Sequence, residues 1–179
     1  MERVKRIDRT LFHKASIFEL YKDKIQVTED KCVEWDFIKH RGAAAVLPVL
    51  ENGRILMVRQ FREAIDRDTL EIPAGGLNSE DEPTIEAAAR ELEEETGFAA
   101  GDKLEFLISV RTAPAYCNEK IDVYIAKDLV KTEQHLDEGE YIKVEEWDVD
   151  QLVDMIYSGE IQDCKTVGAI LAYKLQLQK

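Results

Sequence analysis

Side chains that could hold a metal ion gather in one short stretch, residues 76–98, which reads GLNSEDEPTIEAAARELEEETGF. On a helix, Glu91 and Glu95 lie one turn apart on the same face, with Glu94 beside them. Like charges at this spacing repel each other, and a face built only for stability would include lysines. Mg2+ and Ca2+ bind carboxylate oxygens and would offset the repulsion, so the stretch predicts a cation site. The alternative is an acidic face that simply contacts solvent.

The residues around these glutamates predict the helix that must position them. Pro83 suits the first turn, because its missing N–H would have no helical partner there. The alanines at 87–89 favour a helix, and Gly97 favours its end. The apolar side chains that we expect to pack on the core form a stripe beside the acidic row: Ile85, Ala88, Ala89 and Leu92.

The same stretch resembles, position by position, the signature of the Nudix hydrolases. Gly76 is followed by five residues and Glu82, and seven more residues lead to Arg90 and Glu91. The remaining fixed positions of the signature are also matched, at Leu92, Glu94, Glu95, Gly97 and Phe98. The resemblance implies a loop–helix–loop that binds Mg2+ or Mn2+ and hydrolyses a nucleoside diphosphate joined to another group.

The resemblance also implies a role for each polar residue of the signature. Glu91 and Glu95 would be the main metal ligands, with Glu94 as a third. Glu82 would orient Arg90 or a water of the metal, and Arg90 would hold the carboxylates in place. The alternative for Arg90 is a surface ion pair with a neighbouring glutamate, which contributes little to stability.

The loop before the helix departs from the family pattern, because EIPAGG has two glycines where relatives usually carry one. In the family, the backbone carbonyl at the position of Ala74 often adds a metal ligand. The spacing to Glu82 makes Gly76 the glycine of the signature, whereas the Pro-Ala-Gly alignment makes it Gly75. Both assignments stay open. The resemblance also places Leu77, the next residue, in contact with the substrate.

A second acidic cluster, HLDEGEYIKV at 135–144, precedes an apolar strand pattern. Such a loop is usually a solvated turn, but hydrolysis needs a general base, and a loop that closes over substrate could supply one. The segment resembles the catalytic loop of ADP-ribose pyrophosphatases, which carries Glu-x-Glu before a strand. The match implies a base at Glu138 and a metal-contacting carboxylate at Glu140, with the reverse assignment as the alternative.

Other residues resemble the same subfamily and would bind substrate. Pro114 lies 16 residues past Phe98, where ADP-ribose pyrophosphatases carry a marker proline, although it could be an ordinary turn residue. Glu119 follows in the loop and would bond ribose hydroxyls. Trp35 stands where relatives stack an aromatic ring on adenine, often from the partner of a swapped dimer, and Asp36 is assigned to the same site. A strand tryptophan is otherwise a core residue.

The run VRQFRE at 58–63 also resembles this subfamily. Arg62 would reach a phosphate, because its planar fork matches phosphate oxygens. Arg59 would contact the substrate as well or pair with acidic residues nearby. The resemblance as a whole implies metal-dependent hydrolysis of ADP-ribose to AMP and ribose 5-phosphate. Another nucleotide-sugar pyrophosphatase, such as a GDP-mannose enzyme, and a nucleotide-binding module without catalysis are the alternatives.

The composition limits the classes of function. With 179 residues, of which 45% are hydrophobic, the chain is long enough for one domain with a real core. A formal net charge of −13 argues against binding a nucleic acid, and would repel a phosphate substrate without a bound dication. No apolar run approaches the roughly 20 residues of a membrane span, and no signal region follows the charged N-terminus. The cysteines, Cys32, Cys117 and Cys164, predict reduced thiols in a cytoplasmic protein.

The hydrophobic pattern predicts an α/β fold. Residues 1–40 read as an antiparallel module with short strands at 17–21, 24–28 and 32–39. So small a sheet must lean on its own domain or on a second subunit, so we expect a homodimer. Residues 41–179 resemble the Nudix α/β/α sandwich with a mixed sheet. Its expected strands are 42–50, 55–61, 70–72, 104–110, 121–126 and 141–147.

Turn and helix signals complete the expected second domain. Asn52-Gly53 predicts a hairpin that pairs the strands on either side of it, and residues 63–69 read as a loop. One helix starts near Asp148 or Asp150 and stops at Gly159. A last helix starts near residue 163, with an apolar stripe at Val167, Ile170, Leu171 and Leu175.

Overall fold

The computed structural model describes residues 4–101 and 104–178. The chain divides into two compact units. One unit contains Met1–Gly42 and Arg111–Lys120, and the other contains Ala43–Val110 and Ile121–Lys179. The segment Arg111–Lys120 therefore groups with the N-terminal strands, although it is far from them in sequence. Within the described residues, no helix is both long enough and apolar enough to cross a membrane.

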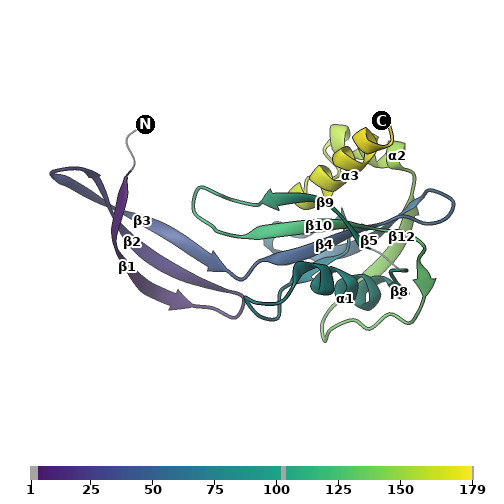
Figure 1. Ribbon diagram of the computed structural model, residues 1–179, viewed down its shortest axis with the longest axis horizontal. Coiled ribbons are helices and arrows are strands. Elements are labelled where there is room, and N and C mark those ends of the chain that lie inside the picture. The colour runs from purple at the N-terminus through teal and green to yellow at the C-terminus, as the bar shows by residue number, and fades with distance from the viewer. Residues whose placement is uncertain (1–3, 102–103, 179) are drawn as a thin grey trace. The chain divides into compact units, whose positions relative to one another are not determined.

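The first unit is built on a three-stranded antiparallel sheet, in the order β1-β2-β3 (Figure 1). Its strands are β1 (Lys5–Lys14), β2 (Phe18–Thr28) and β3 (Lys31–His40). The prediction of two short strands between 17 and 28 is wrong, because β2 runs through the expected turn without a break. Asp23, which lies between the two expected strands, is buried and accepts 2.6 Å hydrogen bonds from Nε and Nη2 of Arg9 on β1. An ion pair between charged side chains thus joins β1 to β2, and hydrophobic patterning did not predict β1 for this reason.

The segment Arg111–Lys120 is hydrogen-bonded to the end of β3. The N–H of Ile38 donates to the carbonyl of Tyr116 at 2.7 Å, and the N–H of Asn118 donates back to Ile38 at 3.2 Å. The Asn118 side chain also accepts from the N–H of His40 at 2.7 Å. These bonds fix a loop that contains Pro114 and Glu119 beside β3.

The second unit contains a mixed sheet, as predicted, in the order β7-β4-β10-β9. Its strands are β4 (Ala43–Pro48), β7 (Ala74–Gly76), β9 (Leu104–Arg111) and β10 (Lys120–Ala126). Strand β4 is parallel to β10 and antiparallel to β7. A second, antiparallel sheet has the order β12-β5-β6. It contains β5 (Ile55–Arg62), β6 (Arg67–Glu71) and β12 (Ile142–Trp147), and β8 (Phe98–Ala99) pairs separately with β11 (Val130–Lys131).

The chain turns at Asn52-Gly53, but the strands on either side do not form the expected hairpin. A single bridge joins Val49 to Ile55, after which β4 and β5 enter different sheets. The expected loop at 63–69 is shorter than predicted, because β6 begins at Arg67 after a 3-10 turn at Glu63–Ile65. Strands of both sheets contribute side chains to one hydrophobic core.

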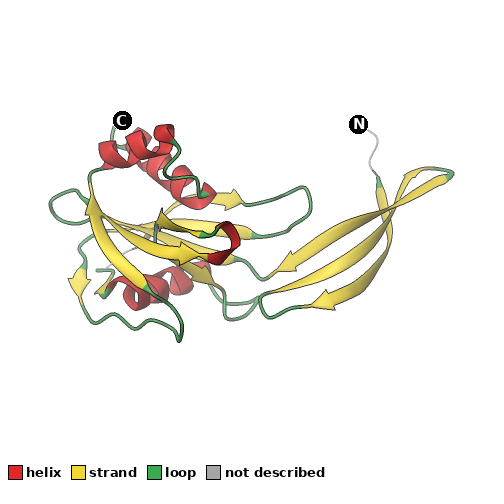
Figure 2. Cartoon of the chain, turned by 180° about the vertical axis from the view of Figure 1, so that it is seen from behind, coloured by secondary structure: helices red, strands yellow, loops and turns green. Residues whose placement is uncertain are grey.

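Three helices cover this core in an α/β/α sandwich, which confirms the expected fold class. Helix α1 (Thr84–Thr96) lies on one side of the strands, and α2 (Val149–Ser158) and α3 (Cys164–Gln176) lie on the other (Figures 1 and 2). Helix α2 begins with a capping box between Asp148 and Gln151 and ends at Gly159, as predicted. The core between the layers includes Leu47, Ile55, Met57, Ile125, Leu152, Ile170 and Tyr173.

The buried faces of two helices differ from the predicted stripes. On α1, Ile85 is 42% exposed, whereas Glu91 and Glu95 are only 9% and 4% exposed. Helix α1 turns its alanines to the strands, because Ala87 and Ala88 are small enough for close packing against Ala44. On α3 the predicted Leu175 is exposed, and the buried residues are Lys165, Thr166, Ala169, Ile170 and Tyr173.

Candidate metal and substrate site

Helix α1 carries the acidic row into the interior of the second unit. The helix stops at Gly97, whose φ of 70° is left-handed and whose N–H donates to Glu93 at 2.9 Å. The last two turns therefore hold Glu91 and Glu95 against strand β7. There, the N–H of Ala74 donates to Oε2 of Glu95 at 3.1 Å. The residue expected to add a backbone ligand thus lies directly beside an expected side-chain ligand.

Two adjacent glycines fill different roles at this point. A Cβ atom on Gly75 would lie 2.1 Å from Oε1 of Glu91, whereas a Cβ on Gly76 would meet nothing within 4 Å. Gly76 instead offers its carbonyl to Nη2 of Arg90 at 3.2 Å. Gly75 is therefore the position at which a side chain would displace a carboxylate, while Gly76 keeps the spacing of the signature.

Arg90 connects the glutamates to one another. Its Nη1 donates to Oε1 of Glu91 at 2.5 Å and to Oε2 of Glu94 at 3.0 Å. Its Nη2 lies 3.5 Å from Oε1 of Glu82. The carboxylate of Glu82 also accepts hydrogen bonds from the N–H and the side chain of Asn78. The guanidinium thus touches three of the expected site carboxylates and fixes their orientation.

Burial raises the pKa values of two of these glutamates. Burial chiefly raises the pKa of Glu91, against the effect of Arg90. Burial, and then the charge of Glu91, raise the pKa of Glu95 to about 8. Two neighbouring carboxylates that resist ionisation in this way would be stabilised as anions by a bound cation.

The donor set fits a divalent cation. Among residues 4–101 and 104–178, no three acidic, histidine or cysteine side chains already surround a common point. However, Gly75 leaves a cradle that a methyl group would fill, and the carboxylate of Glu91 occupies it next to Glu95. Oxygen donors of this kind suit Mg2+ or Ca2+ and would not select a soft metal.

The acidic loop before β12 is attached to the end of α1. The N–H of Thr132 donates to Gly97 at 2.8 Å, that of His135 donates to Glu94 at 2.9 Å, and Gln134 Nε2 donates to the carbonyl of Glu95 at 2.6 Å. Beyond these contacts, the charge of Glu140 raises the pKa values of the α1 carboxylates as a lesser cause after burial. Glu140 therefore lies close to the acidic row.

The tip of this loop holds the other expected carboxylate. Glu138 is exposed, next to Gly139, whose φ of 90° requires a left-handed conformation. The N–H of Glu140 donates to Asp137 at 3.0 Å across the turn, and the N–H of Asp137 donates to Oε2 of Glu140 at 3.2 Å. Both glutamates are exposed, and Glu140 is the one whose side chain is hydrogen-bonded within the loop.

Other expected substrate residues of the second unit are occupied by protein contacts. Arg59 forms a two-fold pair with Glu145, at 3.0 and 3.1 Å, which is the alternative that the sequence left open. Arg62 pairs with Glu71 at 2.8 and 2.7 Å, and its side chain is partly exposed. Leu77 is buried among the alanines of α1. Sequence reasoning missed Glu71, although an acidic residue between Leu70 and Ile72 in a buried strand pattern was a usable signal.

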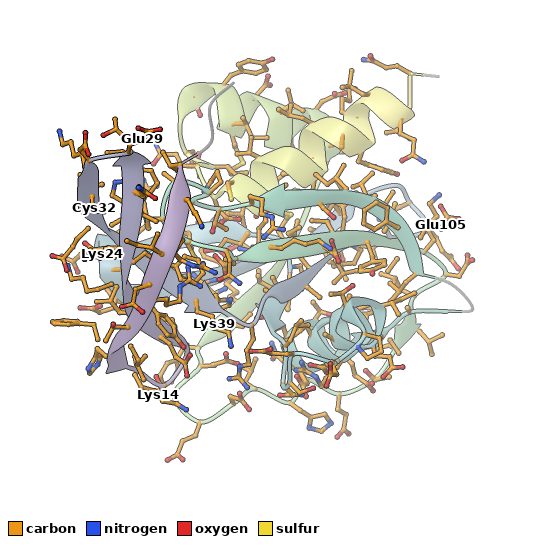
Figure 3. All side chains as sticks on the ribbon, turned by 60° about the vertical axis from the view of Figure 1, so that its left-hand side comes forward. Lys14, Lys24, Glu29, Cys32, Lys39 and Glu105 are labelled. Atoms are coloured by element: carbon orange, nitrogen blue, oxygen red, sulfur yellow. The ribbon has the colours of Figure 1, made fainter. Side chains whose placement is uncertain are left out.

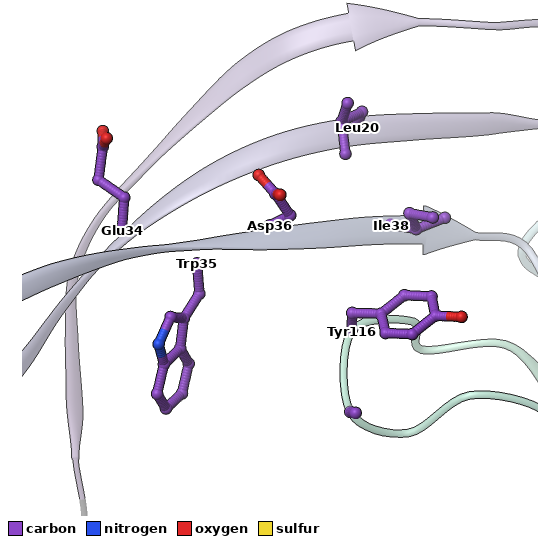
Figure 4. A pocket seen from close by; sticks show the side chains of 7 residues that line it. Leu20, Glu34, Trp35, Asp36, Ile38 and Tyr116 are labelled. Carbon is purple, nitrogen blue, oxygen red and sulfur yellow. The ribbon is translucent and has the colours of Figure 1, made fainter.

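The remaining expected residues lie in the first unit, where they line two adjoining pockets. Trp35 and Asp36 line one of about 660 Å3 together with Leu20, Glu34, Ile38, Ala115 and Tyr116. Trp35 and Tyr116 lie on one side of β3, whereas Glu34 and Asp36 point to the other (Figure 4). Pro114 lines the second pocket, beside Arg111. Sequence reasoning missed Tyr116, which borders both pockets.

Glu119 lies in the same unit and is already engaged. It accepts a hydrogen bond from Oγ1 of Thr112 at 2.7 Å, and its other oxygen lies 3.4 Å from Nδ1 of His40. These contacts hold the loop that follows Pro114 against the end of β3. A ribose hydroxyl would have to share this carboxylate with Thr112.

The sandwich and its acidic helix define a metal-dependent hydrolase. Residues 39–163 match the NUDIX domain family model, and the chain belongs to the Nudix family of hydrolases, which need a divalent metal ion. The chain is 36% identical to the ADP-ribose pyrophosphatase of Bacillus subtilis, over 98% of this chain and 97% of that protein. It is 35% identical to the methanol dehydrogenase activator of Bacillus methanolicus, over 89% and 86% of the two chains. A crystal structure of an ADP compounds hydrolase has the same fold, with a TM-score of 0.86 at 20% identity, covering 99% of this chain and 96% of that one.

Proposed function

We propose that this protein hydrolyses the diphosphate of ADP-ribose to AMP and ribose 5-phosphate, with Mg2+ or Mn2+ as its metal. The observation that carries the proposal is the pair of buried carboxylates, Glu91 and Glu95, packed against Gly75. The near full-length similarity to a Bacillus subtilis ADP-ribose pyrophosphatase supports the choice of substrate.

The residues of α1 would hold the metal. Glu91 and Glu95 would be its main ligands, with Glu94 and the carbonyl of Ala74 completing the protein donors. Once bound, the ion would neutralise charge on the diphosphate oxygens in the transition state. Arg90 keeps the carboxylates of Glu91 and Glu94 in one orientation, and Glu82 pairs with its other terminal nitrogen.

The loop before β12 would supply the base. Water attacks one phosphorus of the diphosphate, the bond to the bridging oxygen breaks, and the proton of the water passes to a carboxylate. We assign this carboxylate to Glu138, at the exposed tip of the loop, and a metal contact to Glu140, whose charge acts on Glu91 and Glu95. The exchange of these two roles is the alternative.

The pocket of the first unit would bind the adenine ring. Trp35 is 49% exposed and shares the pocket with Tyr116, so both rings are available for stacking. Asp36 and Pro114 lie at its borders. Aromatic stacking of this kind tolerates other bases, which is why the pocket alone does not select adenine.

We also propose a homodimer in the cytoplasm. Side chains of the first unit, including the labelled Lys24 and Cys32, extend from its strands (Figure 3). Several apolar ones are exposed there, namely Val4, Ile7, Leu11, Phe12 and Ile17. A second copy is the occupant that would cover them. The three cysteines form no disulfide, which suits a reducing compartment.

A substrate panel tests the proposed activity. The protein is incubated with Mg2+ and ADP-ribose, GDP-mannose, other nucleotide sugars, dinucleotides and nucleoside triphosphates, and AMP and phosphate products are separated by ion-exchange chromatography. We expect ADP-ribose to be hydrolysed fastest. If ADP-ribose is the slowest of these, the assignment is wrong, and if GDP-mannose is the fastest, the alternative nucleotide-sugar activity is correct.

A regulatory role is the second candidate, because one of the similar proteins is named as an activator of another enzyme. A nucleotide-binding module without catalysis would bind ADP-ribose and release no AMP. The intact acidic row of α1 favours catalysis over this role. Single-turnover assays with excess protein separate the two, because a module yields no product at any protein concentration.

A further inference from the structure

Strand β5 carries two arginines in the same kind of contact on opposite faces. Arg59 and Arg62 each donate from Nε and Nη2 to both oxygens of a glutamate, which is Glu145 for the first and Glu71 for the second. The two arginines are three residues apart, and side chains alternate along a strand, so they point to opposite sides of the sheet. One pair therefore serves as an internal comparison for the other.

Glu71, which pairs with Arg62, is buried and has further hydrogen-bond partners. Glu71 is 3% exposed, and its Oε1 also accepts from Thr69 Oγ1 at 2.6 Å. Its Oε2 accepts from Lys165 Nζ at 2.5 Å, and Lys165 is held by Asp163 at 2.9 Å. Burial raises the pKa of Glu71, but Arg62 and Lys165 outweigh it and lower the pKa to about 2. The carboxylate is thus charged and cannot rotate.

The guanidinium of Arg62 keeps an outer edge beyond its pair with Glu71. Its side chain is 43% exposed, and in the described part of the chain its Nη1 has no hydrogen-bond partner. After Glu71, the charge of Glu95 also raises the pKa of Arg62, so the guanidinium lies within electrostatic reach of that carboxylate.

We infer that Glu71 is a positioning residue that fixes the guanidinium of Arg62 and presents its Nη1 to a phosphate oxygen of the substrate. This inference rests on the proposed function, because it takes the diphosphate of ADP-ribose as the ligand. Two of the five guanidinium donors are bound by Glu71, and the outer edge stays available for a charge-assisted bond to phosphate. Lys165 and Thr69 act one step further away, by holding Glu71.

The test measures binding without hydrolysis. The probe is α,β-methylene ADP-ribose with Mg2+, and its dissociation constant is determined by calorimetry for the full-length protein. We expect Glu71→Gln to weaken binding on the order of tenfold, because Arg62 then loses its fixed orientation. Glu145→Gln is the matched control and should change the constant by less than about twofold, since its arginine lies on the other face.

A double variant separates positioning from loss of stability. We expect Arg62→Ala and Arg62→Ala/Glu71→Gln to bind the probe equally weakly, because Glu71 acts only through Arg62. Unchanged binding by Glu71→Gln, or an additive loss in the double variant, overturns the inference. A wild-type protein that binds the probe but does not hydrolyse ADP-ribose refutes the proposed function and leaves the inference intact. A wild-type protein that does not bind the probe overturns both.

Discussion

Gly75 leaves the space that the carboxylate of Glu91 occupies, since a Cβ atom on Gly75 would lie 2.1 to 2.4 Å from the carboxylate atoms of Glu91. The Glu91 carboxylate can occupy this position on strand β7 because Gly75 has no side chain. The neighbouring Gly76 has open space around its Cα and serves through its carbonyl instead. The two glycines are adjacent, yet only the first is coupled to the acidic row.

This coupling predicts different effects for two alanine substitutions. Gly75→Ala should lower kcat with Mg2+ by on the order of a hundredfold, because the new methyl group must push the Glu91 carboxylate off its position. The fold should survive, since the displaced group is the end of a flexible side chain. Gly76→Ala should leave kcat within about threefold, because its Cβ meets nothing. Steady-state kinetics of both variants tests this, and equal losses would show that Gly75 has no special relation to Glu91.

Glu95→Gln should abolish turnover while the protein stays folded. The substitution removes one of two adjacent buried carboxylates, so we expect a fall in kcat of several orders of magnitude from the loss of a metal ligand. In EDTA, the melting temperature should equal or exceed that of the wild type, because Gln is neutral at every pH, whereas burial and Glu91 oppose the ionisation of Glu95. Melting curves with and without Mg2+ provide the check. An unchanged rate would exclude the metal role of Glu95.

The extent of α1 followed from local signals, whereas its buried face followed only in part, because Ala88 and Leu92 are buried as predicted but Ile85 is not. Pro83, the alanines and Gly97 determine where the helix begins and ends, and these depend only on neighbouring residues. Hydrophobic patterning assigned the core face to Ile85 and placed the glutamates beside it. In the structure, Ile85 is exposed and Glu95 is buried. A buried acidic pair breaks the rule on which such patterning rests, and departures of this kind are expected at functional sites.

The contacts of the arginines on β5 depend on strand register, which one sequence does not contain. The pairing of Gln60 with Thr69 brings Arg62 to the same side of the sheet as Glu71. A shift by one residue would have turned every side chain of β6 to the opposite face. Lys165, from α3, completes the cluster only because the helix packs there. Residue types therefore predicted an anion-binding arginine, but not the carboxylate that holds it.

The Glu71 cluster predicts a dependence of stability on pH. The pKa of Glu71 is about 2 in the folded protein, below its ordinary value of 4.5, so its contribution is present above pH 4.5 and is lost as the pH falls toward 2. A difference of this size corresponds to about 3 kcal/mol as an upper bound. Urea unfolding of the wild type and of Glu71→Gln should give a large gap in unfolding free energy at pH 7. The gap should narrow between pH 4.5 and pH 2, and a constant gap would contradict a charged Glu71.

The proposed adenine pocket predicts different responses for two nearby residues. Trp35→Ala should raise KM for ADP-ribose by on the order of tenfold and leave kcat nearly unchanged, because stacking contributes to binding and not to the chemical step. Cys32→Ser, on the same strand, should alter neither constant. Steady-state kinetics measures kcat and KM for both variants. The quench of tryptophan fluorescence on AMP binding checks the stacking. A fall in kcat with constant KM would place Trp35 outside the binding pocket.

The exposed apolar side chains of β1 predict that self-association depends on this strand. Phe12 is 67% exposed, so Phe12→Glu should cost the isolated subunit little, but it would place a charge in any interface that covers β1. We expect sedimentation velocity to show a dimer for the wild type and a monomer for Phe12→Glu. Leu177→Glu, at an exposed apolar residue after α3, is the control and should remain a dimer. A wild-type protein that sediments only as a monomer would refute the dimer, and a dimeric Phe12→Glu would place the interface elsewhere.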